Sequence, residues 1–362
     1  MGKASAEKKN KKKKIKPVRV AVIGCNKSAE KHMEALAAMP EAKVVAVCDV
    51  DKKKAKALAK KYKVRRRYAN YMRMLSPLHG GRRIKAVHIC LNDGAGAMVA
   101  GYCLLKKRNV VIEPPMAFDL AGVRSVIKDS DYMSKQCAVV PPARSNALFT
   151  CAKDALSLGR LGQILSARTM LCLTEAEIKA PKTPDGVVFG LLAPAIDLVD
   201  ALVEDAVSGL SFSVANRAHA DADEVDSAEG VVTYAGGAKH SFYYTGNHES
   251  SSMQIAIVCE HGEILFEGAD VSITYEDGTK EEVHDDAEIG CADTFREFYE
   301  ACREGRAPAA DVRGALRLHE ILLGLYNDAM ERGVGSSKPP VLSFAGAATE
   351  GESLSKKRRL WY

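Results

Sequence analysis

The sequence predicts an α/β protein with two successive sheets, the first parallel and the second mainly antiparallel. From Val18 to Val140, short apolar runs alternate with stretches of helical periodicity, and strands joined by helices form parallel sheets through right-handed crossovers. After Pro141 and Pro142, several strand-like runs follow one another with only short turns between them. We therefore expect a doubly wound parallel sheet, followed by an α/β domain with a large, mainly antiparallel sheet.

Each element of the first part follows from its local pattern. Five apolar runs predict strands, over residues 18–23, 43–48, 84–90, 110–112 and 137–140. The stretches between these runs have helical periodicity and predict helices, over residues 29–38, 52–62, 95–107 and 120–129. Because the strands are apolar along their whole length, we expect helices on both faces of the sheet.

The second part of the chain has a different residue pattern. It is expected to contain helices over residues 146–158, 186–203, 294–303 and 312–332. Its predicted strands cover residues 163–173, 210–215, 230–234, 239–245, 254–259, 263–267 and 271–275. Turns rich in glycine and acidic residues separate the later strands, as in hairpins.

The two ends of the chain are basic and are predicted to lie outside the fold. Residues 1–16 form a lysine-rich arm that cannot pack, residues 17–142 the first domain, 143–343 the second and 344–362 a basic tail. The net charge is +6, and it comes from the two ends. Lys11–Lys14 and Lys356–Arg359 can contact nucleic acid or an import receptor, whereas the simpler interpretation is a pair of solvated tails.

The cysteine pattern and the hydropathy of the chain indicate the cellular compartment in which the protein is expected. Ten cysteines occur without any CxxC pair, which is typical of reduced core thiols in a reducing compartment, and no His/Cys spacing predicts a zinc site. No apolar run reaches 18 residues, so we expect no membrane span. The lysine-rich arm lacks the apolar segment of a signal peptide and does not match that pattern. A cytoplasmic protein is expected, or a nuclear one if the basic ends direct import.

The turn after the first strand carries part of a dinucleotide fingerprint. The pattern G-x-G-x-x-G/A places a pyrophosphate at a helix N-terminus, and Gly24 and Ala29 fit its first and third positions. Asn26 occupies the second position, where its side chain is expected to crowd the pyrophosphate. Since asparagine tolerates left-handed backbone angles, the turn can still form. Cys25 and Ser28 complete the turn.

Asp49 strengthens the nucleotide interpretation. It ends the second predicted strand, about 20 residues beyond the turn, where an acidic side chain accepts hydrogen bonds from a ribose 2′-OH. A carboxylate there favours NAD over NADP. The alternative is that Asp49 caps the helix that starts near Lys52.

Over residues 17–343 the chain resembles the glucose–fructose oxidoreductase/inositol dehydrogenase (Gfo/Idh/MocA) family. The segments that carry the resemblance include "RVAVIGCNKSAEKHMEAL", "KVVAVCDVDKKKAKALAKKY", "VVIEPPMAFDLAGV", "SLGRLGQILSART" and "FREFYEACREGRAPAADVRGALRLHEILLGLYNDA". The resemblance implies an N-terminal Rossmann domain and a C-terminal α/β domain with an open sheet that often packs against another subunit. It also implies NAD(P)-dependent oxidation or reduction of sugars, cyclitols and similar polyols.

The chain departs from the family pattern at the functional positions. The family's Glu-Lys-Pro motif reads Glu113-Pro114-Pro115, and its Thr-Pro pair reads Leu91-Asn92. A histidine that follows that pair in the family is Gly96 here.

The last family motif is also altered. The aspartate and histidine that handle substrate in the family correspond to Gly190 and Pro194, whereas the aspartate at 197 is retained. His32 and Arg144 match the family pattern, although His32 is not a catalytic group and Arg144 is at least as well explained by a structural role.

These replacements favour a catalytically degenerate protein. A positioned general acid or base contributes about 10²–10⁴ in rate, and the lysine, histidine and aspartate are absent together. We assign no catalytic residue and no metal, and we expect at most weak NAD binding. The residues expected to contact NAD are Gly24, Cys25, Asn26, Ser28, Ala29, Asp49, Leu91, Asn92 and Glu113.

Three functions remain open from the sequence. The first is a pseudoenzyme that acts as a binding or assembly module with a protein partner, or as an oligomer formed through the C-terminal sheet. The second is an active NAD-dependent oxidoreductase on a sugar or polyol, with non-standard residues from a hairpin that faces the substrate side in the resembling fold. The candidates on that hairpin are Lys239, His240, Tyr243, Tyr244 and His248, and the simpler interpretation is an exposed polar face opposite a packed one. The third is a protein tethered to nucleic acid or to another partner by its lysine arm.

Overall fold

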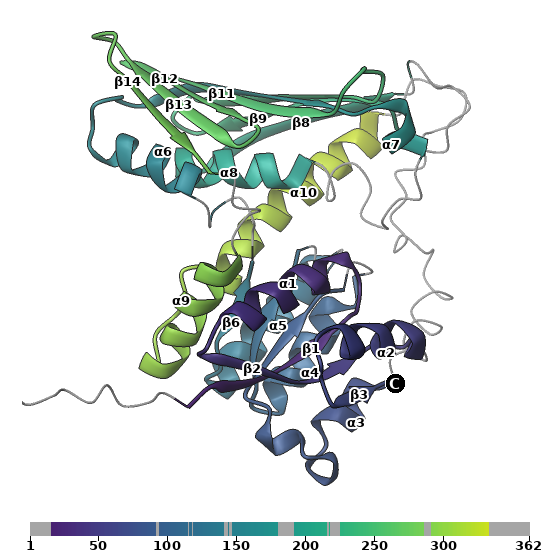
Figure 1. Cartoon of the computed structure of the whole chain (residues 1–362). Coiled ribbons are helices and arrows are strands. Elements are labelled where there is room, and N and C mark those ends of the chain that lie inside the picture. Colours follow the sequence, from purple (N-terminus) through teal and green to yellow (C-terminus); the bar gives the residue numbers. More distant parts are fainter. Residues whose placement is uncertain are drawn as a thin grey trace, which may run out of the picture.

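The computed structural model describes residues 16–91, 94–114, 116–117, 119–140, 144, 147–179, 192–215, 217, 225–285 and 291–332. The described elements build a six-stranded parallel sheet and an eight-stranded, mainly antiparallel sheet, each packed against helices (Figure 1). The predicted fold class is therefore confirmed.

The first sheet has the strand order β3-β2-β1-β4-β5-β6 with all neighbours parallel. Its strands are β1 Val18–Ile23, β2 Ala42–Cys48, β3 Arg66–Tyr68, β4 Ala86–Ile89, β5 Asn109–Ile112 and β6 Cys137–Val139. The order reverses between β1 and β4, and ligands of doubly wound sheets bind at the carboxyl ends of the strands at such a point. The edge strand β3 was not predicted, because its residues include two arginines and form no apolar run.

Helices cover both faces of this sheet. They are α1 Lys27–Ala38, α2 Lys52–Lys61, α3 Tyr71–Leu75, α4 Gly96–Leu105 and α5 Leu120–Met133, with the short 3₁₀ turns η1 Pro77–His79 and η2 Gly81–Arg83. The last four residues of β1 have no exposed surface, which explains why the strand is apolar without alternation.

The second sheet has the order β14-β13-β12-β11-β7-β10-β9-β8. Its strands are β7 Ile164–Cys172, β8 Val207–Ala215, β9 Ser227–Tyr234, β10 Lys239–Thr245, β11 Ser252–Cys259, β12 Gly262–Glu267, β13 Asp270–Tyr275 and β14 Lys280–His284. β7 and β10 pair in parallel, and the other pairs are antiparallel. β14 was not predicted because it is polar and mostly exposed.

Helices cover one face of the second sheet and lie between it and the first sheet (Figure 1). They are α6 Ala147–Ser157, α8 Ala193–Val203 and α10 Val312–Arg332, with the short α7 Glu175–Lys179 at one end. α10 packs on β8 at one end and on α5 at the other, so it links the two halves. None of the helices in the described part of the chain is long and apolar enough to span a membrane.

The helix α9 Cys291–Glu304 packs on the first half although it follows the second in sequence. Phe295, Phe298 and Tyr299 join the core formed by α1 and one face of the parallel sheet. The domain boundaries proposed from the sequence remain predictions. The packing of α9 shows only that the first core receives side chains from beyond residue 290.

Candidate functional site

The turn between β1 and α1 lies at the carboxyl edge of the parallel sheet and depends on Gly24. The Gly24 backbone has a φ of +88°, and a Cβ atom at this position would lie 2.0 Å from the carbonyl oxygen of Cys90. The Gly24 N–H also donates to the Cys48 carbonyl at 2.9 Å. Only glycine allows the turn to approach β4 this closely.

Asn26 closes the N-terminus of α1 with its own side chain. Its Oδ1 accepts a hydrogen bond from the Ala29 N–H at 2.9 Å, and its Nδ2 donates to the Cys90 carbonyl at 3.1 Å. The backbone of Asn26 is extended, with φ −94° and ψ −172°, so the turn forms without a left-handed conformation at this residue. The amide oxygen thus takes a helix N–H that an anion at this terminus would otherwise use.

Asp49 binds the backbone of the fingerprint turn. One carboxylate oxygen accepts from the Cys25 N–H and the other from the Asp51 N–H, both at 2.8 Å. The α2 N-cap is Asp51, which accepts from the N–H groups of Lys53 and Lys54, so the alternative role of Asp49 as that cap is wrong. Each Asp49 oxygen keeps a further acceptor position for a ligand hydroxyl.

Glu113 lies at the outer end of a chain of polar side chains that runs into the core, in which the two inner contacts are hydrogen bonds and the Glu113–His32 contact is an ion-pair distance without hydrogen-bond geometry. Its Oε1 lies 3.1 Å from His32 Nε2, His32 Nδ1 lies 2.9 Å from His88 Nδ1, and His88 Nε2 lies 2.7 Å from the Tyr299 hydroxyl. Both histidines are fully buried, whereas the Glu113 side chain keeps 22% of its surface exposed. Burial lowers the pKa of His88 well below its usual value, so this ring is neutral.

The proton positions in this chain follow from Tyr299. Burial raises the pKa of Tyr299 well above its usual value, which keeps the proton on its hydroxyl. When that hydroxyl donates to His88 Nε2, the neutral His88 ring carries its proton on Nδ1 and donates it to His32 Nδ1.

Three side chains at the same edge form a candidate metal cluster. His32, Cys90 and Glu113 each place one possible ligand atom within 4.8 Å of the other two. Nitrogen, thiolate and carboxylate ligands are the set that zinc accepts. Spacing rules do not detect this group, because its members come from three separate elements. A metal ion would have to replace the contact between His32 and Glu113.

Proline or glycine occupies the positions that the sequence resemblance aligns with the family's lysine, aspartate and second histidine. Pro114 lines a cavity of about 720 Å³ that also touches α8, α9 and α10. Gly96 starts α4, and a Cβ atom there would lie 3.0 Å from both Ile112 Cδ1 and the Met116 carbonyl oxygen. Pro194 lies in the first turn of α8. Asn92, Pro115 and Gly190 lie outside the described residues.

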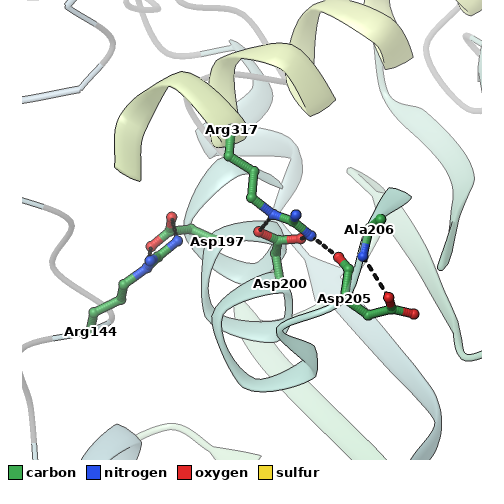
Figure 2. A network of polar contacts seen from close by, with 6 residues as sticks. All are labelled: Arg144, Asp197, Asp200, Asp205, Ala206 and Arg317. Atoms are coloured by element: carbon green, nitrogen blue, oxygen red, sulfur yellow. Dashed lines mark hydrogen bonds and ion pairs between the residues drawn. The ribbon is translucent and has the colours of Figure 1, made fainter. Parts of the chain in front are cut away.

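Two arginine–aspartate pairs occupy the wall of this cavity (Figure 2). Arg144 donates to both oxygens of Asp197 at 2.7 and 2.5 Å, and Arg317 donates to both oxygens of Asp200 at 2.6 and 2.7 Å. Arg317 also donates to the Asp205 carbonyl. Burial raises the pKa of Asp197, and the bond from Arg144 opposes that shift. These contacts give Arg144 and Asp197 a structural role.

The candidates for a relocated active site divide between the two faces of β10. Lys239 is exposed and Tyr243 half-buried on the outer face, whereas His240 and Tyr244 are buried on the inner face. Because α6, α8 and α10 cover the inner face, the outer face points away from the parallel sheet (Figure 1). Lys239 and Tyr243 therefore point away from the parallel sheet, whereas His240 and Tyr244 are buried beneath the helices. His248 bonds the Ser250 carbonyl in the turn after β10.

His240 is a buried neutral histidine with a predictable acid response. Its Nε2 lies 2.8 Å from the Thr169 hydroxyl, and burial lowers its pKa to about 3. An unfolded chain binds the proton near pH 6.5, so this residue costs no stability above pH 6.5 and destabilises the fold as the pH falls toward 3. The expected slope is about 1.4 kcal/mol per pH unit.

Urea unfolding of the wild-type chain and the His240→Gln variant at pH 7.5, 5.5 and 4.5 measures this slope. The variant should lose about 1.4 kcal/mol less per pH unit below 6.5. The exposed His248→Gln variant is the matched control and should follow the wild type. Parallel curves for wild type and His240→Gln would contradict the assignment.

Comparisons with known proteins agree with this architecture. Residues 18–140 match the model of an oxidoreductase family with an NAD-binding Rossmann fold, Gfo/Idh/MocA. Over the whole chain, a search among curated proteins found no match.

Solved structures share the fold across most of the chain. An oxidoreductase domain protein from Kribbella flavida has a TM-score of 0.78 at 15% identity, covering 87% of this chain and 98% of that one. Myo-inositol 2-dehydrogenase from Lactobacillus plantarum has a TM-score of 0.75 at 18% identity, covering 88% and 98%. The WlbA dehydrogenase from Bordetella pertussis, in complex with NADH and UDP-GlcNAcA, has a TM-score of 0.74 at 21% identity, covering 88% and 98%.

The described residues form a two-part fold, in which a parallel sheet of the Rossmann type is followed by a mainly antiparallel sheet. The family model confirms the resemblance to the Gfo/Idh/MocA family over residues 18–140, and the solved structures show the same fold over most of the chain.

Proposed function

We propose that this chain is a catalytically degenerate relative of the Gfo/Idh/MocA oxidoreductases, which binds NAD weakly and acts as a binding or assembly module. The observation that carries the proposal is Asn26, whose amide oxygen occupies the Ala29 N–H at the helix terminus where the pyrophosphate would bind.

The main residues expected to contact the nucleotide lie at the edge of the sheet where such ligands bind. The turn at Gly24, the Asp49 carboxylate and Glu113 all lie at the carboxyl ends of β1, β2 and β5, next to the point where the strand order reverses. The family model and the NADH complex of WlbA supply the class of ligand. An incoming pyrophosphate must displace the Asn26 cap, which lowers the affinity but does not abolish the site.

Hydride transfer from a polyol needs a base for the hydroxyl proton. Pro114 and Pro194 provide none, and the nearby Asp197 and Asp200 are each held by an arginine. Each missing acid or base removes about 10²–10⁴ in rate, so the chain is expected to turn over polyols at background level.

One observation favours an active enzyme with non-standard residues as the alternative. The Glu113 carboxylate lies 3.1 Å from the buried His32 ring, which is hydrogen-bonded to His88 and through His88 to Tyr299, so these four side chains form a polar chain from the surface into the core. Glu113 would then be the base in place of the missing lysine, because it is the member of the chain that reaches the surface.

The outer face of the second sheet supports the assembly role. The strands present Met170, Tyr243 and Val258 on the side that the helices leave uncovered, and Met170 and Val258 are 37% and 45% exposed. A partner subunit or another protein packing on this face would bury these apolar side chains.

Calorimetric titration with NAD⁺ and NADH, combined with a polyol oxidation screen, tests the proposal. We expect a dissociation constant in the high micromolar range or weaker, at least tenfold weaker binding in Asp49→Ala, and no NADH formation from sugars or cyclitols. Asp51→Ala, which removes the α2 cap instead, is the control and should bind as the wild type does. Substrate-dependent NADH formation that Glu113→Gln abolishes would establish the active alternative.

A further inference from the structure

One edge of the parallel sheet carries an uncompensated positive surface. Between residues 52 and 85 the chain has fourteen lysines and arginines and no aspartate or glutamate, and all fourteen side chains are exposed. They are Lys52, Lys53, Lys54, Lys56, Lys60, Lys61, Lys63, Arg65, Arg66, Arg67, Arg73, Arg82, Arg83 and Lys85. We call this surface the basic edge.

The basic edge is built by consecutive elements on the same side of the fold. α2, β3, α3, η2 and the connections next to them carry these residues, and β3 is the outermost strand of the sheet (Figure 1). The elements lie on the part of the Rossmann domain that points away from the eight-stranded sheet (Figure 1). The surface is therefore open to a partner while the two halves of the molecule stay packed.

Little within the protein neutralises this charge. Of the fourteen cations, only Lys61 forms an ion pair with another described residue, with Glu30 at 2.6 Å. The whole chain has a net charge of only +6, so the average conceals the local accumulation. Like charges held together repel one another and favour an anionic partner.

The basic edge also contains a cavity with the chemistry of a phosphate site. The cavity has a volume of about 390 Å³, and Lys52, Arg67, Arg73 and His79 line it together with the half-buried ring of Tyr68. Arg73 Nε donates to His79 Nε2 at 3.2 Å, and the Tyr68 hydroxyl donates to the His79 carbonyl at 3.3 Å. Cations that bind phosphate beside an aromatic ring that can stack on a base are typical of nucleic-acid sites.

We propose that the basic edge binds a nucleic-acid strand through its phosphates, with one nucleotide held in the cavity at Tyr68. α2 alone has ten residues and is about 15 Å long, which is the length of about four phosphates along one strand of B-form DNA. The surface thus exceeds what a single cofactor phosphate requires.

Two simpler explanations of this surface, a membrane contact and protection of an edge strand, account for it less well. A membrane would need an apolar face, but Leu78 is the one large apolar side chain exposed within the basic edge. Arginines on an edge strand also protect a sheet from aggregation, which accounts for Arg66 and Arg67. That role does not explain the gathering of Lys52, Arg73 and His79 around one cavity.

Fluorescence anisotropy with a labelled single-stranded 20-mer, in RNA and DNA form, tests the proposal on the full chain. The triple variant Lys52→Ala, Arg67→Ala and Arg73→Ala removes the cavity cations. We expect at least tenfold weaker binding at 100 mM salt, and a salt dependence of log K that is less steep by about 2, since each phosphate that is no longer neutralised reduces the slope by about 0.7. The variant should keep its melting temperature, since the three side chains are exposed.

A matched control removes the same charge elsewhere. The triple variant Lys128→Ala, Lys239→Ala and Lys280→Ala changes three lysines outside the basic edge and should bind within twofold of the wild type. Replacing Lys11–Lys14 with alanine separates the contribution of the arm, and the weakening caused by the cavity variant should persist in that background.

Three results would overturn the proposal. Equal weakening in the cavity and control variants would mean that only net charge matters. Binding to phosphatidylserine vesicles without binding to the 20-mers would assign the surface to a membrane. A cavity variant that no longer binds NADPH but still binds the 20-mers would reduce the site to a pocket for a cofactor phosphate.

Discussion

Replacing Gly24 with alanine is expected to lower the free energy of unfolding by about 2–5 kcal/mol. A φ of +88° costs an L-residue about 1–2 kcal/mol, and the added Cβ would lie 2.0 Å from the Cys90 carbonyl oxygen. That overlap forces β1 and β4 apart at the crevice and adds an overpacking cost of about 1–3 kcal/mol. Urea denaturation measures the decrease.

Gly237→Ala is the matched control for this prediction. Gly237 has a φ of +95°, but nothing lies within 4 Å of the position where its Cβ would stand. Its substitution should therefore cost only the backbone strain, about 1–2 kcal/mol. Equal decreases at the two positions would contradict the account of the turn, because the steric overlap with Cys90 would then contribute nothing.

Replacing Asp200 with alanine is expected to cost about 2–3 kcal/mol. Asp200 is 3% exposed and accepts two hydrogen bonds from Arg317, so its removal leaves a guanidinium without its counter-ion (Figure 2). Breaking a buried pair on one side costs about 3–5 kcal/mol, and the 41% exposure of Arg317 reduces that value.

The exposed pair between Arg124 and Glu320 provides the comparison. Both side chains are about half exposed, and Glu320→Ala should cost less than about 1 kcal/mol by the same urea measurement. If Asp200→Ala costs no more than Glu320→Ala, the pair does not fix α10 to α8, and its role at the cavity must be reconsidered.

The parts of the fold that were predictable are those where burial alone sets the residue pattern. β1 and α10 were placed at their observed bounds, since Val18–Ile23 is mainly apolar and Val312–Arg332 keeps a helical period. β3 and β14 were missed because edge strands need no buried side chains, and theirs are mainly charged. The packing of α9 on the first core depends on contacts that chain order does not reveal.

The candidate site was predictable only where local geometry determines it. Gly24, Asp49 and Glu113 follow strands whose ends the doubly wound fold brings together at the carboxyl edge. His88 and Tyr299 were missed because 211 residues separate them, and because His88 lies within an ordinary apolar strand and Tyr299 on an ordinary amphipathic helix. A histidine inside a fully buried strand was the available signal, because a buried polar side chain needs a partner.

The role of Asn26 could not be read from its position in the fingerprint. The pattern predicted that its side chain would crowd the pyrophosphate, whereas the structure shows that the side chain itself takes the helix N–H. The basic edge could not be predicted from the net charge, because acidic residues elsewhere in the chain offset its fourteen cations in the total. Charge and capping are local properties, and they decide what this scaffold can bind.

Titration of NADH into the wild-type chain and the Asn26→Gly variant tests the central claim most directly. Glycine frees the Ala29 N–H and removes the side chain from the pyrophosphate position, at a capping cost of only a few tenths of a kcal/mol. We predict weak binding by the wild type and at least tenfold tighter binding by the variant. Low-micromolar binding by the wild type that the substitution leaves unchanged would contradict the account of a site closed by its own asparagine.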